Sequence, residues 1–238
     1  MARVLPDDLA SAAGQAWRHE DITRDRPVRR FRRRGRPRRR AGSRHTPEFS
    51  FADCPTVLPT GADPAKWRCE EMAATGTVQF GTLPTLDLPM LRMTFAEGTL
   101  DGRFAQTFGA LRAEPVRIPR SHMSLRFQYG GFSDFQSNDQ RMGEVHLKLA
   151  VEGFGVPSTC TIGTDAEPIR FVVKRQTPTE VVSTNPLVVR FSIADTSFTV
   201  PRSSGCGPFS RMIDQRLGLP SAEGNSLVLH NRVGIRGY

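Results

Sequence analysis

The sequence is short of lysine, of long apolar runs and of closely spaced cysteines, and these shortages exclude several classes of protein. Of the 33 basic residues only Lys66, Lys148 and Lys174 are lysine. No apolar run approaches the roughly 18 residues that a membrane span needs, so no membrane partner is expected. Neither the cysteines nor the histidines come at the spacing of zinc ligands, which disfavours a zinc site.

The four cysteines lie far apart in the sequence, at Cys54, Cys69, Cys160 and Cys206, and none belongs to a C-x-x-C pair. The first residues do not have the pattern of a secretory signal peptide. We therefore expect reduced thiols in an intracellular protein.

The positive charge is concentrated in the first fifth of the chain. Residues 1–44 carry 14 arginines and five acidic residues, which accounts for the whole net charge of +9. Residues 45–238 carry 19 basic and 19 acidic residues and are neutral overall. The sequence therefore predicts a basic arm, 1–44, joined to a body whose charges balance.

Within this arm, the stretch from Arg26 to Arg44 holds 11 arginines and no acidic residue. Like charges repel, and Pro27, Gly35 and Pro37 oppose a helix, so we expect this stretch to be disordered until it meets a polyanion. Arginine grips phosphate oxygens and releases counterions, so the arm should bind nucleic-acid backbone without regard to base sequence. Arginine-rich pentamers also serve as nuclear-localisation signals. The predicted nucleic-acid-binding residues are Arg26, Arg29, Arg30, Arg32, Arg33, Arg34, Arg36, Arg38, Arg39, Arg40 and Arg44.

The body reads as an all-β domain. Residues 45–70 are predicted to form an extended lead-in, and residues 71–238 contain short runs in which apolar and polar side chains alternate, as in half-buried strands. The clearest runs are 122–129 and 144–151. Further predicted strands are 76–82, 90–96, 115–118, 157–162, 169–174, 186–193, 197–200 and 226–235.

Two segments are predicted to be helices. In 103–112, Phe104, Phe108 and Leu111 share one helical face, and the apolar residues of 208–217 do the same. No strand alternates with a long helix, which disfavours a parallel sheet. The expected fold is thus a single antiparallel β-sandwich with two short helices.

An arginine arm ahead of a neutral β body resembles the capsid proteins of small icosahedral viruses. That family implies a jelly-roll sandwich that assembles into a shell with further copies of itself, while the arm packages the genome. The resemblance rests on the layout alone and on no diagnostic motif. It implies no enzymatic activity, and its partners would be genomic nucleic acid, RNA in preference to DNA, and other copies of the chain.

The same resemblance implies a location in the virion and in the host cytoplasm, with the nucleus as a further location through the arm. It also bears on the loop acids Asp134, Asp139, Asp165 and Glu167, since carboxylates that meet across subunits can hold Ca²⁺. Acids in turns are otherwise ordinary, and no cofactor is expected.

Three alternatives stay open. Leu100-Asp101-Gly102-Arg103 resembles the signature of plant-virus movement proteins, which bind single-stranded nucleic acid. Ser204-Gly205-Cys206-Gly207 resembles the nucleophile turn of viral chymotrypsin-like cysteine proteases, with Cys206 as the nucleophile, although no histidine precedes it at the family's usual distance. A cellular RNA-binding protein is the third alternative, and the neutral body disfavours it.

Overall fold

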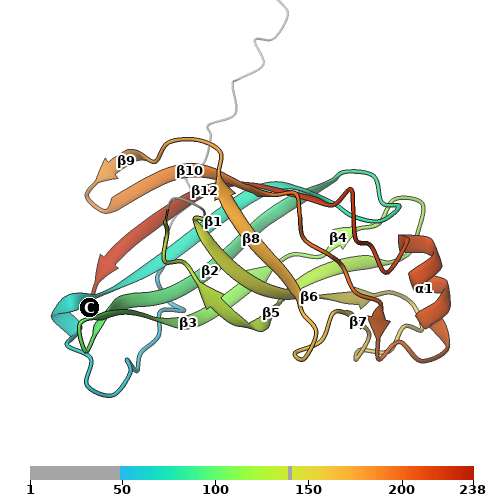
Figure 1. Cartoon of the computed structure of the whole chain (residues 1–238), viewed down its shortest axis with the longest axis horizontal. Coiled ribbons are helices and arrows are strands. Elements are labelled where there is room, and N and C mark those ends of the chain that lie inside the picture. Colours follow the sequence, from blue (N-terminus) through green and yellow to red (C-terminus); the bar gives the residue numbers. More distant parts are fainter. Residues whose placement is uncertain (1–48, 139–140) are drawn as a thin grey trace, which may run out of the picture. The chain divides into compact units, whose positions relative to one another are not determined.

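The computed structural model describes residues 49–138 and 141–238 (Figure 1), and these residues form an almost wholly β structure. They contain one α-helix, α1 (Ser210–Leu217), which follows a short 3₁₀ turn, η2 (Gly207–Phe209). A second 3₁₀ turn, η1 (Pro64–Lys66), precedes the first strand. The strands are β1 (Trp67–Gln79), β2 (Leu86–Leu100), β3 (Arg103–Ala113), β4 (Val116–Arg117), β5 (Ser124–Asp134), β6 (Gly143–Glu152), β7 (Thr161–Ile162), β8 (Ile169–Arg175), β9 (Glu180–Thr184), β10 (Leu187–Asp195), β11 (Ser203–Ser204) and β12 (Ser226–Gly237).

The strands form a curled antiparallel sheet in which neighbours along the chain are mostly neighbours in the sheet (Figure 1). β1, β2 and β3 follow one another as hairpins, β5 and β6 form another hairpin, and β6 also pairs with β8. β8 continues to β10 and β10 to β12, and β12 pairs along its whole length with β1. This consecutive order differs from the Greek-key order of a jelly roll, so the structure gives an antiparallel β fold without confirming the jelly-roll prediction.

The curl brings β3 and β5 towards each other, although they are not paired as neighbours in the sheet. The rings of Phe108 on β3 and Tyr129 on β5 stack with their centroids 3.6 Å apart. Side chains on the inner face of the sheet therefore surround a common interior.

Alternation along each strand decides which side chains fill this interior. On β12, Leu227, Leu229 and Val233 are buried in the main core, whereas His230 is exposed. The β1–β12 register runs without a shift from Arg68 to Gln79, so this alternation is unbroken. The core is built mainly of leucine, valine, isoleucine, phenylalanine and methionine from all the long strands.

The two clearest strand predictions are confirmed, since 122–129 overlaps β5 and 144–151 lies within β6. The predicted helix at 208–217 is also confirmed, as η2 and α1. Of the predicted strand 197–200, only Val200 makes a bridge, to Ser221. Trp67 to Glu70, expected in the lead-in, already belong to β1.

The predicted helix at 103–112 is wrong, because this segment is β3. The pairing with β2 shifts by one residue at Gly109, since Thr94 lies opposite Ala110 and Phe95 opposite Phe108. This bulge reverses the alternation, so Phe108 and Leu111, three residues apart, both pack on the core. The bulge therefore gives this strand a three-residue spacing of apolar side chains, which is also typical of one face of a helix.

The segment before β1 is fastened to the outer face of the sheet. Phe51 donates its backbone N–H to the buried Glu71 carboxylate at 2.6 Å, and Arg112 donates two hydrogen bonds to Asp53. A disulfide joins Cys54 to Cys69 on β1. Residues 51–54 are therefore held against the outer face of the sheet before the chain enters β1.

A second disulfide joins Cys160, ahead of β7, to Cys206, ahead of η2. With both bonds formed, none of the four cysteines is free. The expectation of reduced thiols is therefore wrong. The partners are 15 and 46 residues apart, and only the fold brings them together.

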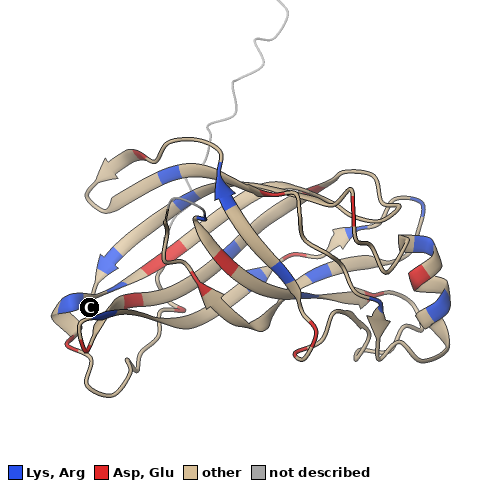
Figure 2. Ribbon diagram, in the orientation of Figure 1, with Lys and Arg blue, Asp and Glu red and all other residues tan. Residues whose placement is uncertain are grey.

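Charged side chains are scattered over the strands and turns of the described structure, and both signs occur in most regions (Figure 2). Within residues 49–138 and 141–238, no helix has the length and apolar character needed to cross a membrane.

Candidate ligand cavity

The arginines predicted to bind nucleic acid, all between Arg26 and Arg44, lie outside the described residues. Of the acids considered for Ca²⁺, Asp139 also lies outside them. Asp134 is paired with Arg141, and Asp165 accepts a hydrogen bond from Lys148 Nζ at 2.6 Å. In the part of the chain that is described, no three His, Cys, Asp or Glu side chains gather as metal ligands would.

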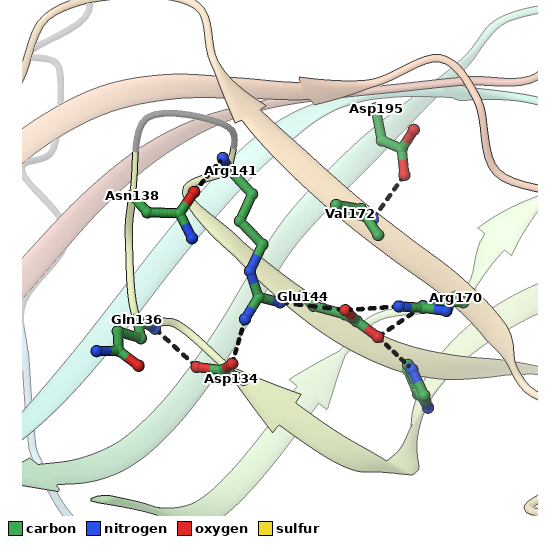
Figure 3. Close-up of polar contacts among 9 residues, drawn as sticks. Asp134, Gln136, Asn138, Arg141, Glu144, Arg170, Val172 and Asp195 are labelled. Atoms are coloured by element: carbon green, nitrogen blue, oxygen red, sulfur yellow. Dashed lines mark hydrogen bonds and ion pairs between the residues drawn. The ribbon is translucent and has the colours of Figure 1, made fainter. Parts of the chain in front are cut away.

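The densest ionic cluster surrounds Glu144 on the outer face of β6 (Figure 3). Arg170 on β8 donates two hydrogen bonds to its carboxylate, at 2.6 and 3.0 Å, and His146 lies 2.9 Å away. Arg141 bridges Glu144 and Asp134. Burial tends to raise the pKa of Glu144, but the hydrogen bonds and charges of Arg170 and His146 outweigh it and lower that pKa. The cluster ties β6 to β8 and has its charges matched, so we assign it a structural role.

The two motifs that suggested viral functions have simple structural settings. Leu100 ends β2, and Asp101 and Gly102 form the turn into β3, with Asp101 at a φ of 52°. Cys206 is bonded to Cys160 and is therefore not a free thiol. The protease hypothesis loses its nucleophile.

The interior of the curled sheet contains a cavity of about 280 Å³. Its wall is mainly apolar and comes from β1, β2, β8, β10 and β12 and from the segments around Phe135, Met142 and Thr179. A smaller cavity of about 40 Å³, lined by apolar side chains alone, shares part of this wall. The residues common to both cavities are Met72, Phe135, Val173 and Ile193.

Three charged side chains line the larger cavity, and they form one cluster. Arg68 Nε lies 2.8 Å from Glu70 Oε1 and 3.1 Å from Glu97 Oε1. Gln106 on β3 donates from Nε2 to Glu97 Oε2 at 3.4 Å, while its buried Oε1 has no hydrogen-bond partner in the described structure. The Arg68 side chain is 53% exposed, which places this cluster at the mouth of the cavity.

Glu70 has the most perturbed acidity of the described groups. Its side chain is only 12% exposed. Burial and the neighbouring charge of Glu97 raise its pKa from 4.5 to about 7, against the opposing effect of Arg68. Two carboxyl groups thus share one guanidinium. Near neutral pH, Glu70 is therefore partly protonated and partly ionised.

A polar side chain lies further along the inner face. Asn231 on β12 alternates with Leu229 and Val233, is 2% exposed, and has no hydrogen-bond partner for either amide atom among the described residues. Ile235 and Val233 line the larger cavity, while Leu229 and Leu227 line the smaller one. Asn231 lines neither of these cavities; with Thr75, Phe191 and His230 it lines a separate pocket of about 430 Å³.

Sequence reasoning missed this cavity, since Arg68 and Glu70 lie in the expected lead-in and Glu97 lies directly after the predicted strand 90–96. Asn231 interrupts the apolar series of the predicted strand 226–235 at a position whose neighbours two residues away are Leu229 and Val233. A buried amide in such a place needs a partner.

Comparison of the chain with protein-family models, with curated proteins and with solved structures finds no match.

Proposed function

We propose that the protein binds a small, largely apolar molecule inside its curled sheet. The observation that carries this proposal is the mainly apolar cavity of about 280 Å³, with Arg68, Glu70 and Glu97 clustered at its mouth. Binding sites for small molecules are typically concave and mostly apolar, with a few polar groups that orient the ligand. The cavity and its charged mouth have this composition.

The proposal is tested by titrating the protein with N-phenyl-1-naphthylamine, an uncharged dye that fluoresces in apolar surroundings. We expect saturable binding to the intact chain. Val173→Trp, which fills both cavities, should abolish it, whereas Val57→Trp, on a side chain that is 79% exposed, should not. If Val173→Trp is folded by circular dichroism and still binds the dye, the cavity is not the binding site.

We infer from the two disulfides that the protein works in an oxidising compartment. Disulfides persist outside the cytosol and are rare within it. Both bonds here are between cysteines of the compact body, and they fasten the segment before β1 and the segment before α1.

The arm supports a second candidate function. We infer that Arg26 to Arg44 bind nucleic-acid backbone, because 11 arginines without an acidic residue form a strong and unselective polyanion site. The capsid hypothesis extends this inference to a closed shell, and it stays a prediction, as does the movement-protein hypothesis. Electron microscopy of the protein mixed with RNA or DNA at low salt separates them, since a capsid protein forms closed particles and a movement protein does not.

A further inference from the structure

We propose that the ligand of the cavity is a cationic amphiphile, whose amine or similar N–H⁺ head lies between Glu70 and Glu97 while its apolar part fills the interior. This inference rests on the proposed ligand-binding function. It adds the chemical class of the ligand.

The first reason is the charge at the mouth. Arg68, Glu70 and Glu97 are the charged residues that line the cavity in the described structure, and with both acids ionised their sum is negative. The guanidinium of Arg68 is already engaged by both carboxylates, at 2.8 and 3.1 Å. A ligand carboxylate would therefore meet two like charges and no free cation, whereas an ammonium head would meet acceptors.

The second reason is the state of Glu70. Burial and the charge of Glu97 raise its pKa to about 7, because one guanidinium does not compensate for two buried carboxylates. A cationic ligand head at this position would favour the ionised form of Glu70, and the Glu70 carboxyl group would release its proton. The strands that pair with β1 at this level contribute Phe95 and Ile235 opposite Glu70, and neither carries a charge. Arg68 is the one cation among the described residues that lowers the pKa of Glu70.

The third reason is the apolar wall beyond the mouth. Met72, Val173 and Ile193 line both cavities, so the interior suits the apolar part of an amphiphile.

Calorimetric titration of the full chain with octylamine, octanol and octanoate tests the inference, because these probes share one chain and differ in the head. At pH 8 we expect octylamine to bind roughly tenfold more tightly than octanol, the effect of a charge-assisted hydrogen bond, and octanoate to bind most weakly. At pH 5.5 the advantage of octylamine should shrink, since Glu70 gains a proton while the amine keeps its charge.

Glu70→Gln should remove most of the difference in affinity between octylamine and octanol. Glu152→Gln, which alters an acid paired with Arg126 outside the cavity, is the matched control and should keep the preference. If octanol or octanoate binds as tightly as octylamine, the inference that the ligand has a cationic head is wrong. The proposed function, binding of a small molecule in the cavity, is then still supported. If none of the three probes nor the naphthylamine dye binds, the proposed function fails as a whole.

Discussion

Asn231 lies directly opposite Phe191 in the β10–β12 register, and neither its amide nitrogen nor its amide oxygen has a hydrogen-bond partner in the described structure. A buried amide in this state lowers the stability of the ligand-free protein.

Replacement of this amide should stabilise the free protein. Asn231→Leu removes an unpaired buried polar group at nearly constant volume, and we expect the free energy of unfolding to rise by about 1–3 kcal/mol. Urea unfolding followed by circular dichroism measures the change.

Asn225 provides a matched control, because it is equally buried and fully bonded. Its amide donates to Phe198 O at 2.8 Å and Ser221 O at 3.2 Å, and accepts from Ser221 Oγ at 2.7 Å. Asn225→Leu should therefore lower the free energy of unfolding by at least about 1–3 kcal/mol. If both variants change stability in the same direction, Asn231 has a partner in solution.

The raised pKa of Glu70 predicts an unusual dependence of stability on pH. A carboxyl with a higher pKa in the folded state stabilises the fold in its protonated form, fully below its ordinary pKa of 4.5 and progressively less as the pH rises through about 7. The difference corresponds to roughly 3 kcal/mol at most. Glu70→Gln should therefore be more stable than the parent at pH 8 and similar to it near pH 4. Denaturant unfolding across this range measures the effect, and parallel curves for the two proteins would contradict it.

Glu144 should have the opposite effect to Glu70 on the pH dependence of stability. Because Arg170 and His146 lower its pKa, its contribution is present above the ordinary pKa of 4.5 and disappears as the pH falls through the folded value. Glu144→Gln should melt at a lower temperature than the parent at pH 7 and lose less stability on acidification. Thermal melts at pH 7 and pH 3 check this, and an unchanged melting temperature at pH 7 would argue against the network.

The two disulfides predict resistance to alkylation and a loss of stability on reduction. The chain-entropy relation gives about 3 kcal/mol for the 15-residue separation and about 4 kcal/mol for the 46-residue one. Mass spectrometry after iodoacetamide should detect no labelled cysteine until the protein is unfolded and reduced. Labelling of Cys54 or Cys160 in the native, unreduced protein would refute the pairing.

Removal of residues 1–44 should abolish nucleic-acid binding and leave the ligand cavity intact. Binding by the full chain should weaken steeply between about 50 and 200 mM salt, whatever the base sequence. Filter binding of RNA and DNA measures both effects. Tight binding by residues 45–238 alone would mean that the body has a nucleic-acid site of its own.

Alternation of apolar and polar side chains was enough to predict β5, β6 and the all-β character. A strand with one buried face has an apolar side chain at every second position, and this pattern is visible in the sequence. The same reasoning failed at β3, where the bulge at Gly109 places Phe108 and Leu111 on one face. A bulge depends on the partner strand, so its position is not visible in one segment of sequence.

The cavity depends even more on tertiary contacts. Glu70 and Glu97 are 27 positions apart and meet only because β1 and β2 pair with Arg68 opposite Glu97. The cysteine pairs depend on the fold in the same way. Asn231 is the exception, since a single amide within an alternating apolar run could have been recognised as a candidate site from the sequence.

The pairing of β1 with β12 has a consequence for the order of events during synthesis. Most strands find their partner in the segment made just before them, but β1 must wait for Ser226–Gly237 before its second edge is covered. On the ribosome, the growing chain therefore carries an uncovered strand edge and an open apolar interior until nearly all of the sheet has been made. Folding of the sheet is therefore completed only after β12 has been synthesised.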